Sequence, residues 1–380
     1  MFSELDKLRT RLINGIQNTP QVEEGMSSKE VLTAIENVIL GIVTSLSRDE
    51  APVLSVPNRA RWDNVRFDRS VGFQMSSESA VVSVRSNCVS SVTKFAQILK
   101  ILSVVYRLVQ SNKYATKRDI YYRNMQLFGS QATVDSIVDD LSCLLKAPRR
   151  SLHVLATTKG LIAGDLQYME EDGTRIDCHC SSAAVQLSSN ISGIRNIVSS
   201  AKFVLIVEKD ATFQTLLDED FCSKLHPCIM ITGKGVPDVN SRLMVRKLWD
   251  VLHIPVFALV DADPHGIEIM CIYKYGSLSM SFEAHSLTIP SLMWLGLLPS
   301  DIQRLRVHQD ALVPLTHRDE IKLNSLLKRP FLTSHPNWKK EMALMQQTKV
   351  KAEIQALATI APDFLTSVYL PNKLLYGGWV

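Results

Sequence analysis

The sequence lacks most of the features that mark secreted, membrane or disulfide-rich proteins. Its seven cysteines are an odd number among 380 residues. They are scattered through apolar segments, as at Cys143 and Cys271, which favours buried, reduced thiols. No apolar run approaches the roughly 18 residues that cross a bilayer. The N-terminus, MFSELDKLRTRL, mixes acids with bases where a signal peptide has a hydrophobic stretch. We therefore expect a folded protein of the cytosol or nucleus, with no membrane partner.

A strong charge of one sign is also missing. The 42 Lys and Arg oppose 38 Asp and Glu, and a net charge of +4 does not by itself predict a nucleic-acid partner. Residues 107–150 are more basic, because they hold eight bases and four acids. The bases are Arg107, Lys113, Lys117, Arg118, Arg123, Lys146, Arg149 and Arg150. This window indicates either a DNA contact or an ordinary solvated helical face.

Two amphipathic helices are predicted at the N-terminus, over residues 1–18 and 28–47, with apolar residues at helical spacing. Ser27 and Glu30 form a capping-box pattern before the second helix. A short helix cannot bury an apolar stripe alone, so region 1–48 is our candidate surface for docking a partner. Residues 49–88 show no sustained period, and we interpret them as an irregular linker.

Three further helices are predicted at about 92–111, from 116 and at about 133–146, followed by a β-hairpin turning at Lys159 and Gly160. Three helices and a hairpin wing are the order of a winged helix-turn-helix, which presents its third helix to DNA. The basic window coincides with this region, so we assign residues 89–190 to a winged-helix domain. Its candidate DNA contacts are Lys117, Arg123, Arg149 and Arg150.

From about residue 195 onward the pattern changes to short apolar runs alternating with helical stretches. The runs at 203–208, 229–232 and 256–263 predict strands of a parallel sheet, so residues 195–380 form an α/β domain with a C-terminal extension. The fold class is thus mixed, α/β and α+β, and multidomain. In parallel sheets, chemistry collects where the strands end.

Three carboxylates stand at those strand ends. Glu208 ends the first strand, and Asp261 and Asp263 end the third with side chains on one side of the chain. Clustered carboxylates repel one another, and a bound cation removes that cost. Carboxylate oxygens are ligands that Mg²⁺ prefers, so the sequence predicts Mg²⁺ as the cofactor.

A glycine-rich turn, Thr232-Gly233-Lys234-Gly235, follows the second strand. Its glycines would let the backbone approach a phosphate, and Lys234 would neutralise the charge. It lacks the spacing of a P-loop, so a tight strand-to-helix turn is an equally good interpretation.

Tyr121 and Tyr122 form an aromatic pair within the basic window. Adjacent helical residues point about 100° apart, so at most one of them can face a given phosphate. Arg118 lies one turn before Tyr122 on the same helical face. Its guanidinium would stabilise a phenolate and hold the phosphate, which makes Tyr122 a candidate nucleophile and Arg118 a catalytic residue.

Several long segments are similar to one known family. TKRDIYYRN, VLIVEKDATF, ITGKGVPD, VDADPHGIEI, SMSFEAH and WLGLLPSD resemble the meiotic DNA double-strand-break proteins, relatives of the A subunit of topoisomerase VI. The resemblance covers most of the chain from about residue 90. It implies a nuclear, type II topoisomerase-like transesterase of the isomerase class, with a catalytic tyrosine at Tyr122 and a basic residue at Arg118. It also implies a Toprim domain with its acids at Glu208, Asp261 and Asp263, and a 5′-phosphotyrosyl product.

The same resemblance implies a homodimer whose sites are composite, double-stranded DNA as the substrate and a partner like the topoisomerase VI B subunit. One argument is independent of it: a chain with one candidate nucleophile cuts one strand, so a double-strand break needs two copies. The alternatives are a Toprim nuclease or primase in which the tyrosines only pack, and a non-catalytic DNA-binding scaffold. Cys178-His179-Cys180 also suggests zinc, but a second ligand pair is missing from the sequence.

Overall fold

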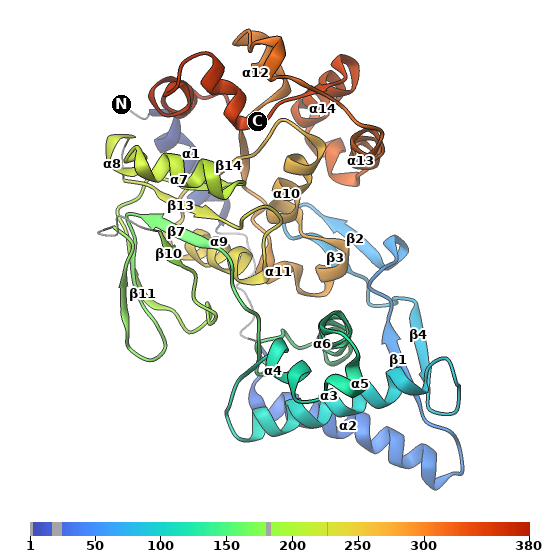
Figure 1. Cartoon of the computed structure of the whole chain (residues 1–380). Coiled ribbons are helices and arrows are strands. Elements are labelled where there is room, and N and C mark those ends of the chain that lie inside the picture. Colours follow the sequence, from blue (N-terminus) through green and yellow to red (C-terminus); the bar gives the residue numbers. More distant parts are fainter. Residues whose placement is uncertain (1–2, 17–24, 180–183, 226) are drawn as a thin grey trace.

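The computed structural model describes residues 3–16, 25–179, 184–225 and 227–380. Figure 1 shows two units, one made mainly of helices and one built around a sheet. We call the first the helical unit, which contains α2 to α6 with strands β1 and β4. We call the second the sheet unit, which contains α1, the β2 and β3 hairpin and the chain from about residue 160 to the C-terminus. Their hydrophobic cores are separate clusters of buried residues.

The helical unit confirms the predicted helices. Its elements are α2 (Ser28–Ser47), α3 (Val92–Gln110), α4 (Lys117–Tyr122), α5 (Met125–Phe128) and α6 (Gln131–Leu145). The capping box of Ser27 and Glu30 is present at α2. A second capping box, between Thr116 and Asp119, begins α4. This cap fixes the start of α4 although the helix is only 6 residues long.

The sheet unit confirms the parallel sheet. Strands β12 (Val204–Val207), β13 (Ile229–Thr232), β14 (Val256–Leu259) and β15 (Met293–Gly296) run parallel in the order β13-β12-β14-β15. Each of the first three is an unbroken buried run, as expected for a sheet covered on both faces. Alternate residues of β12 enter different cores: Ile206 packs in the cluster that contains α9 (Val239–Leu252), and Leu205 in the cluster that contains α7 (Asp210–Asp218).

The predicted linker at 49–88 is wrong, because this region contains four strands. β1 (Val53–Pro57) pairs with β4 (Val81–Arg85), and β2 (Val65–Asp68) forms a hairpin with β3 (Gly72–Met75). The first pair packs on α3 and α6, whereas the hairpin packs on the sheet unit. Segment 49–88 therefore passes from one unit to the other and back.

The predicted hairpin at Lys159 and Gly160 is also wrong. β6 (Val154–Leu155) pairs with β5 (Ala115–Thr116), while β7 (Leu161–Gly164) pairs antiparallel with β13 in the central sheet. β10 (Val185–Gln186) extends that sheet beyond β7. The boundary between the units therefore lies near residue 160, not at 190.

The two N-terminal helices do not form one docking surface. α1 (Ser3–Ile16) packs on α15 (Leu370–Tyr376) of the sheet unit, with Leu5 buried, whereas α2 packs on α3. α2 is long and apolar enough to cross a membrane by length and composition, which the sequence prediction missed. Its buried Val31 and Ile35, and the bond from Tyr106 to Glu36, attach it to the helical unit.

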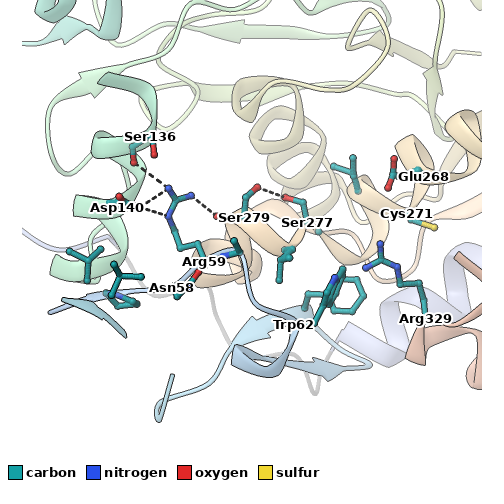
Figure 2. A pocket seen from close by; sticks show the side chains of 18 of the residues that line it. Asn58, Arg59, Trp62, Ser136, Asp140, Glu268, Cys271, Ser277, Ser279 and Arg329 are labelled. Carbon is teal, nitrogen blue, oxygen red and sulfur yellow. Dashed lines mark hydrogen bonds and ion pairs between the residues drawn. The ribbon is translucent and has the colours of Figure 1, made fainter. Parts of the chain in front are cut away.

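The remaining elements complete the sheet unit, and η1 contacts it through Trp62, which packs on Phe73 and lies under the guanidinium of Arg329. They are η1 (Trp62–Asn64), β8 (Gln167–Met169), β9 (Arg175–Asp177), β11 (Arg195–Val198), α8 (Phe221–Leu225), α10 (Pro264–Tyr275), η2 (Leu278–Glu283), α11 (Ala284–Leu287), α12 (Pro299–Arg304), η3 (Gln309–Ala311), β16 (Val313–Pro314), α13 (His317–Leu327), η4 (Pro330–Ser334), α14 (Pro336–Thr348), β17 (Val350–Lys351), η5 (Ile354–Thr359) and the π-helical turn η6 (Leu365–Tyr369). A cavity of about 650 Å³ lies between the units, lined by residues of both, including Arg59, Asp140 and Ser279 (Figure 2).

Candidate functional site

Two of the predicted acids meet where strands β12 and β14 end. Glu208 follows β12 and Asp261 follows β14, and both are buried. The backbone N–H of Asp261 donates to Oε2 of Glu208 over 2.8 Å. Burial, followed by the nearby charge of Asp261, raises the pKa of Glu208 to about 7, and burial also raises the pKa of Asp261. A bound cation would relieve this unfavourable concentration of negative charge.

A lysine already supplies one positive charge there. Nζ of Lys209 lies 2.7 Å from Oδ2 of Asp261 and 3.2 Å from Oε2 of Glu353. The other oxygen of Asp261 accepts the backbone N–H of Ile354 over 2.9 Å. Burial alone would lower the pKa of Lys209, but its two carboxylate partners raise it above the usual value. Sequence reasoning missed Lys209, although its position directly after Glu208 was a usable signal.

Asp263 plays a different local role. It is the N-cap of α10, and its Oδ1 accepts the backbone N–H of Gly266 over 2.6 Å. Its negative charge nevertheless contributes to raising the pKa of both Glu208 and Asp261. Asp263 is therefore close enough to act on the pair electrostatically, while one of its oxygens is used by the helix.

These carboxylates have the right chemistry to bind a divalent cation, but they are not arranged as a complete set of ligands. Among the residues that the structure describes, no group of three or more His, Cys, Asp or Glu is arranged to hold a metal ion. Glu208 and Asp261 offer buried carboxylate oxygens, and Asp263 keeps Oδ2 outside its cap. Binding would require Lys209 to give up Oδ2 of Asp261 or the ion to use other oxygens. Glu208, Asp261 and Asp263 remain the best donors for a hard cation.

Two glycine positions shape the surroundings of Glu208. A Cβ on Gly266 would lie 2.8 Å from Oε2 of Glu208 and 2.7 Å from the carbonyl oxygen of Asp261, so α10 approaches the acids only because this residue has no side chain. Gly235, with φ of +86°, donates its N–H to the Glu208 carbonyl over 2.9 Å. The turn containing Lys234 therefore supports the strand end, and Lys234 itself pairs with Asp210 at 3.0 Å.

The tyrosine pair lies on α4 in the helical unit, and its members face different surroundings. Tyr121 packs against the core of the unit and donates a long hydrogen bond of 3.4 Å to the Gly129 carbonyl. The Tyr122 side chain is exposed, with 62% of its area accessible. Arg118 is exposed on the same helix and makes no ion pair or hydrogen bond with any described residue. The phenol and guanidinium are both free to meet a phosphate.

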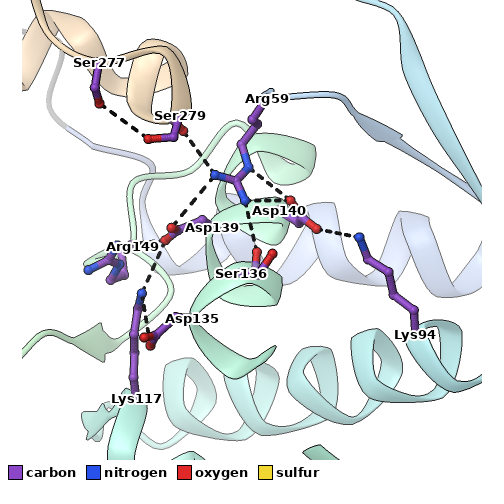
Figure 3. Close-up of polar contacts among 10 residues, drawn as sticks. All are labelled: Arg59, Lys94, Lys117, Asp135, Ser136, Asp139, Asp140, Arg149, Ser277 and Ser279. Atoms are coloured by element: carbon purple, nitrogen blue, oxygen red, sulfur yellow. Dashed lines mark hydrogen bonds and ion pairs between the residues drawn. The ribbon is translucent and has the colours of Figure 1, made fainter. Parts of the chain in front are cut away.

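Several of the bases predicted to contact DNA instead form ion pairs within the protein. Lys117 lies 3.5 Å from both Asp135 and Asp139, and Arg149 donates to Asp139 over 2.8 Å, as Figure 3 shows. Both bases are largely buried, so neither is free to bind phosphate. The acids lie on α6, so the third helix carries a buried charge network where a DNA-reading face was expected. Arg123 remains exposed, and Arg150 lies 3.6 Å from Glu171.

The suggested zinc ligands gain no support. Cys178 is buried, which raises the pKa of its thiol to about 12 and disfavours the thiolate that binds zinc. Cys180 lies outside the described residues. The described cysteines, including Cys143 and Cys271, are free thiols, as the sequence predicted.

Two family models match the chain and define its class. The model of the Toprim domain of Spo11 and the topoisomerase 6 A subunit matches residues 203–374, which hold all three acids. The model named type IIB DNA topoisomerase matches residues 93–154, which hold Tyr122. The second match ends close to the boundary between the two units. Residues 203–374 of the sheet unit are therefore a Toprim domain, a fold that generally binds divalent metals.

Full-length relatives agree with these models. The chain is 60% identical to the meiotic recombination protein SPO11 of Mus musculus over 100% of this chain and 97% of the relative. It is 63% identical to SPO11 of Homo sapiens over 93% of this chain and 89% of the relative. Identity to the DNA topoisomerase 6 A subunit of Arabidopsis thaliana is 37%, over 92% and 81%. The chain belongs to the SPO11 family of meiotic recombination proteins, which are homologues of the topoisomerase VI A subunit.

Proposed function

We propose that this chain is a nuclear, topoisomerase-like transesterase that makes the DNA double-strand breaks that initiate meiotic recombination. The family supports topoisomerase-like chemistry on DNA. The observation that carries the proposal for this chain is the contrast on α4. Tyr122 is exposed, and Arg118 beside it has no ion pair or hydrogen bond within the described part of the chain, whereas Tyr121 is packed. A tyrosine kept only for packing would resemble Tyr121. The helices around α4, with β1 and β4 packed against them, would serve as the winged-helix module.

In the proposed reaction, the phenol oxygen of Tyr122 loses its proton and attacks a backbone phosphorus. The bond from phosphorus to the 3′ oxygen breaks, and that oxygen takes up a proton. The products are a 5′-phosphotyrosyl link and a free 3′ hydroxyl. Arg118 would hold the phosphate and stabilise the phenolate, a role worth on the order of 10² to 10³ in rate for a well-placed donor.

Glu208, Asp261 and Asp263 would hold Mg²⁺, with Lys209 released from Oδ2 of Asp261. A bound Mg²⁺ supplies charge stabilisation for the transferring phosphoryl group or the departing 3′ oxygen. The support for this assignment is the carboxylate donor set and the raised pKa of Glu208, which burial and the charge of Asp261 cause. The choice of Mg²⁺ over other divalent ions rests on its preference for oxygen ligands and phosphate.

The working enzyme would be a homodimer with composite sites. Tyr122 lies on the helical unit and the acids lie on the sheet unit, which Figure 1 places apart. One tyrosine cuts one strand, so a double-strand break uses two chains, each supplying its tyrosine to the acids of the other. The exposed apolar side chains of α2 are the proposed docking surface for a topoisomerase VI B-like partner; they are Ile39, Leu40, Val43 and Leu46.

A covalent adduct tests the proposal directly. The protein is incubated with duplex DNA, Mg²⁺ and, where required, the B-like partner, and the adduct is digested with trypsin. We expect the DNA-linked peptide to contain Tyr122, and Tyr122→Phe to form no adduct. Tyr121→Phe is the matched control and should retain it. Cleavage that persists in Tyr122→Phe, with no protein on the DNA end, would instead identify a metal-dependent Toprim nuclease.

A further inference from the structure

Arg59 connects the two units through its guanidinium. It lies in the loop after β1, and 11% of its side chain is exposed. Nε and Nη2 donate to Oδ1 of Asp140 over 3.0 and 2.8 Å, and Nη2 also donates to the Ser136 carbonyl over 3.2 Å. Nη1 donates over 3.1 Å to the carbonyl of Ser279, which belongs to η2 of the sheet unit (Figures 2 and 3).

On the helical side, this contact leads to the helix of Tyr122. Asp139 lies next to Asp140 on α6, and its carboxylate is 3.9 Å from Nη1 of Arg59. The same carboxylate lies 3.5 Å from Nζ of Lys117, the first residue of α4. Tyr122 is the last residue of that helix. Arg59 and the nucleophile are thus joined by one shared acid and one short helix.

On the sheet side, the contact of Arg59 with Ser279 is linked through η2 and α10 to the predicted metal ligands. Ser279 lies in η2, which follows α10 after the turn at Gly276. The N-terminus of α10 is capped by Asp263, close to Glu208 and Asp261. A displacement of η2 relative to α6 would therefore change the position of α4 relative to α10.

Apolar packing contributes little to the junction between the two units. The buried residues of the helical unit form one cluster, and those of the sheet unit form two others. Arg59 itself lines the cavity of about 650 Å³ between them. Units without a large shared apolar interface are expected to move relative to each other. Polar contacts must then determine their orientation, and arginine suits that task because its planar group holds donors in fixed directions.

We propose that Arg59 is a positioning residue for strand cleavage: it ties α6, and through Asp139 the helix of Tyr122, to η2 of the Toprim domain. In a dimer, this tie sets where each Tyr122 stands relative to the acids of the other chain. The inference rests on the proposed role of Tyr122, but the orientation of the two units can be measured without any chemistry.

The first experiment measures that orientation in the full-length protein. Nitroxide labels are attached to genetically encoded p-acetylphenylalanine at two exposed sites, Gln126 on α5 and Ile321 on α13. Double electron–electron resonance then gives the distribution of distances between the units. We expect a narrow distribution in the parent protein and a broad one in Arg59→Met. An unchanged distribution in Arg59→Met would overturn the proposal.

Two further variants separate positioning from general loss of structure. Lys94→Met removes the other base that contacts Asp140, at 2.9 Å. That base makes no hydrogen bond or ion pair with the described part of the sheet unit, so the distribution should stay narrow. Arg59→Lys keeps a positive charge beside Asp140. A single ammonium cannot span Asp140, Ser136 and Ser279 as the guanidinium does, so the distribution should broaden while the melting temperature falls less than in Arg59→Met.

The second experiment measures adduct formation under saturating DNA. Arg59→Met should reduce the rate by about tenfold to 100-fold, since a misplacement of 1 Å can have that effect. DNA affinity should stay unchanged, because Arg59 is largely buried. If the parent protein forms no Tyr122 adduct but the distance distribution broadens in Arg59→Met, the proposed function fails, and the role of Arg59 in orienting the two units still stands. If adduct rates in the parent and Arg59→Met are equal, the positioning role fails even though Tyr122 is the nucleophile.

Discussion

The two halves of the proposed site are held in opposite ways. The acids end strands in the middle of the central sheet, where Glu208 and Asp261 are buried and linked by a backbone hydrogen bond. Tyr122 ends a helix of 6 residues, and most of its side chain is exposed. The acids are thus fixed by the core of the protein. The proposed nucleophile, in contrast, is positioned by the capping box of α4 and by the ion pair of Lys117 with Asp139.

This difference indicates which half depends on assembly. Carboxylates at the ends of buried strands keep their positions in a single chain, because moving them would disturb the core. In the proposed dimer, an exposed tyrosine on a separate unit would acquire a defined target only when DNA and a second chain are present. Four experiments can break or sharpen this contrast, and the one with the largest expected effect concerns assembly itself.

Mixing two inactive chains should restore one kind of cleavage. A Tyr122→Phe chain keeps its acids, and a Glu208→Gln chain keeps its tyrosine. In a heterodimer with composite sites, one site is complete and the other lacks both components, so we expect single-strand nicks in supercoiled plasmid. Each variant alone should give none. If both components of each site came from one chain, the mixture would also give none, which would break the comparison.

The two halves should differ in their contribution to stability. Leu259 lies on β14 with no accessible area, so Leu259→Ala should lower the free energy of unfolding by about 2–5 kcal/mol. Tyr122→Phe should change it by less than about 0.5 kcal/mol, because an exposed hydroxyl is removed. Chemical denaturation of the metal-free protein measures both. A large loss of stability in Tyr122→Phe would mean that the tyrosine is a structural residue.

The exposed face of α2 should affect association but not folding. Leu40→Asp and Val43→Asp add charge to side chains that are 62% and 54% exposed. We expect the affinity for a topoisomerase VI B-like partner to fall by about tenfold or more, with little change in melting temperature. Asn37→Asp, at an exposed polar position of the same helix, is the control. Deleting α1 is a poor test, since α1 packs on α15.

The smallest expected effect concerns the lysine beside the acids. A divalent cation at the proposed site would compete with Lys209 for Oδ2 of Asp261, so Lys209→Met should bind Mn²⁺ or Mg²⁺ about two- to tenfold more tightly in calorimetry. Lys202→Met, at an exposed lysine before β12, should leave affinity unchanged. Weaker binding in Lys209→Met would show that the lysine assists the metal site.

Much of the fold could be predicted where the signal is local. The strands at 204–207, 229–232 and 256–259 are unbroken apolar runs, and the caps at Ser27 and Thr116 are explicit in the sequence. The errors involve pairing between distant segments. β1 pairs with β4 across an insertion that itself contains a hairpin. β7 pairs with β13 rather than with β6, the strand that precedes it. Alternation within a segment does not reveal which strand it joins.

The candidate site shows the same limit. Strand ends pointed to the three acids, of which the structure joins Glu208 and Asp261 by a hydrogen bond, and the catalytic role of Tyr122 stays a prediction. The hydrogen bond from Ile354 to Asp261 involves a backbone N–H from a residue 93 positions away, which no side-chain pattern reveals. The pairing of Lys117 and Arg149 with Asp139 was missed for a related reason. A base in a basic window looks available until its acidic partner on another helix is known.

The absence of a side chain at Gly266 has a consequence for interpreting genetic variants. A methyl group there would meet Oε2 of Glu208 at 2.8 Å, although residue 266 is neither a proposed ligand nor a nucleophile. Alanine favours helices, so Gly266→Ala would look harmless by its chemical similarity and its effect on the helix. A protein carrying Gly266→Ala would nevertheless be expected to behave like a protein in which Glu208 itself is changed. Inherited changes in this protein should therefore be judged by their distance from the acids, not by the severity of the substitution.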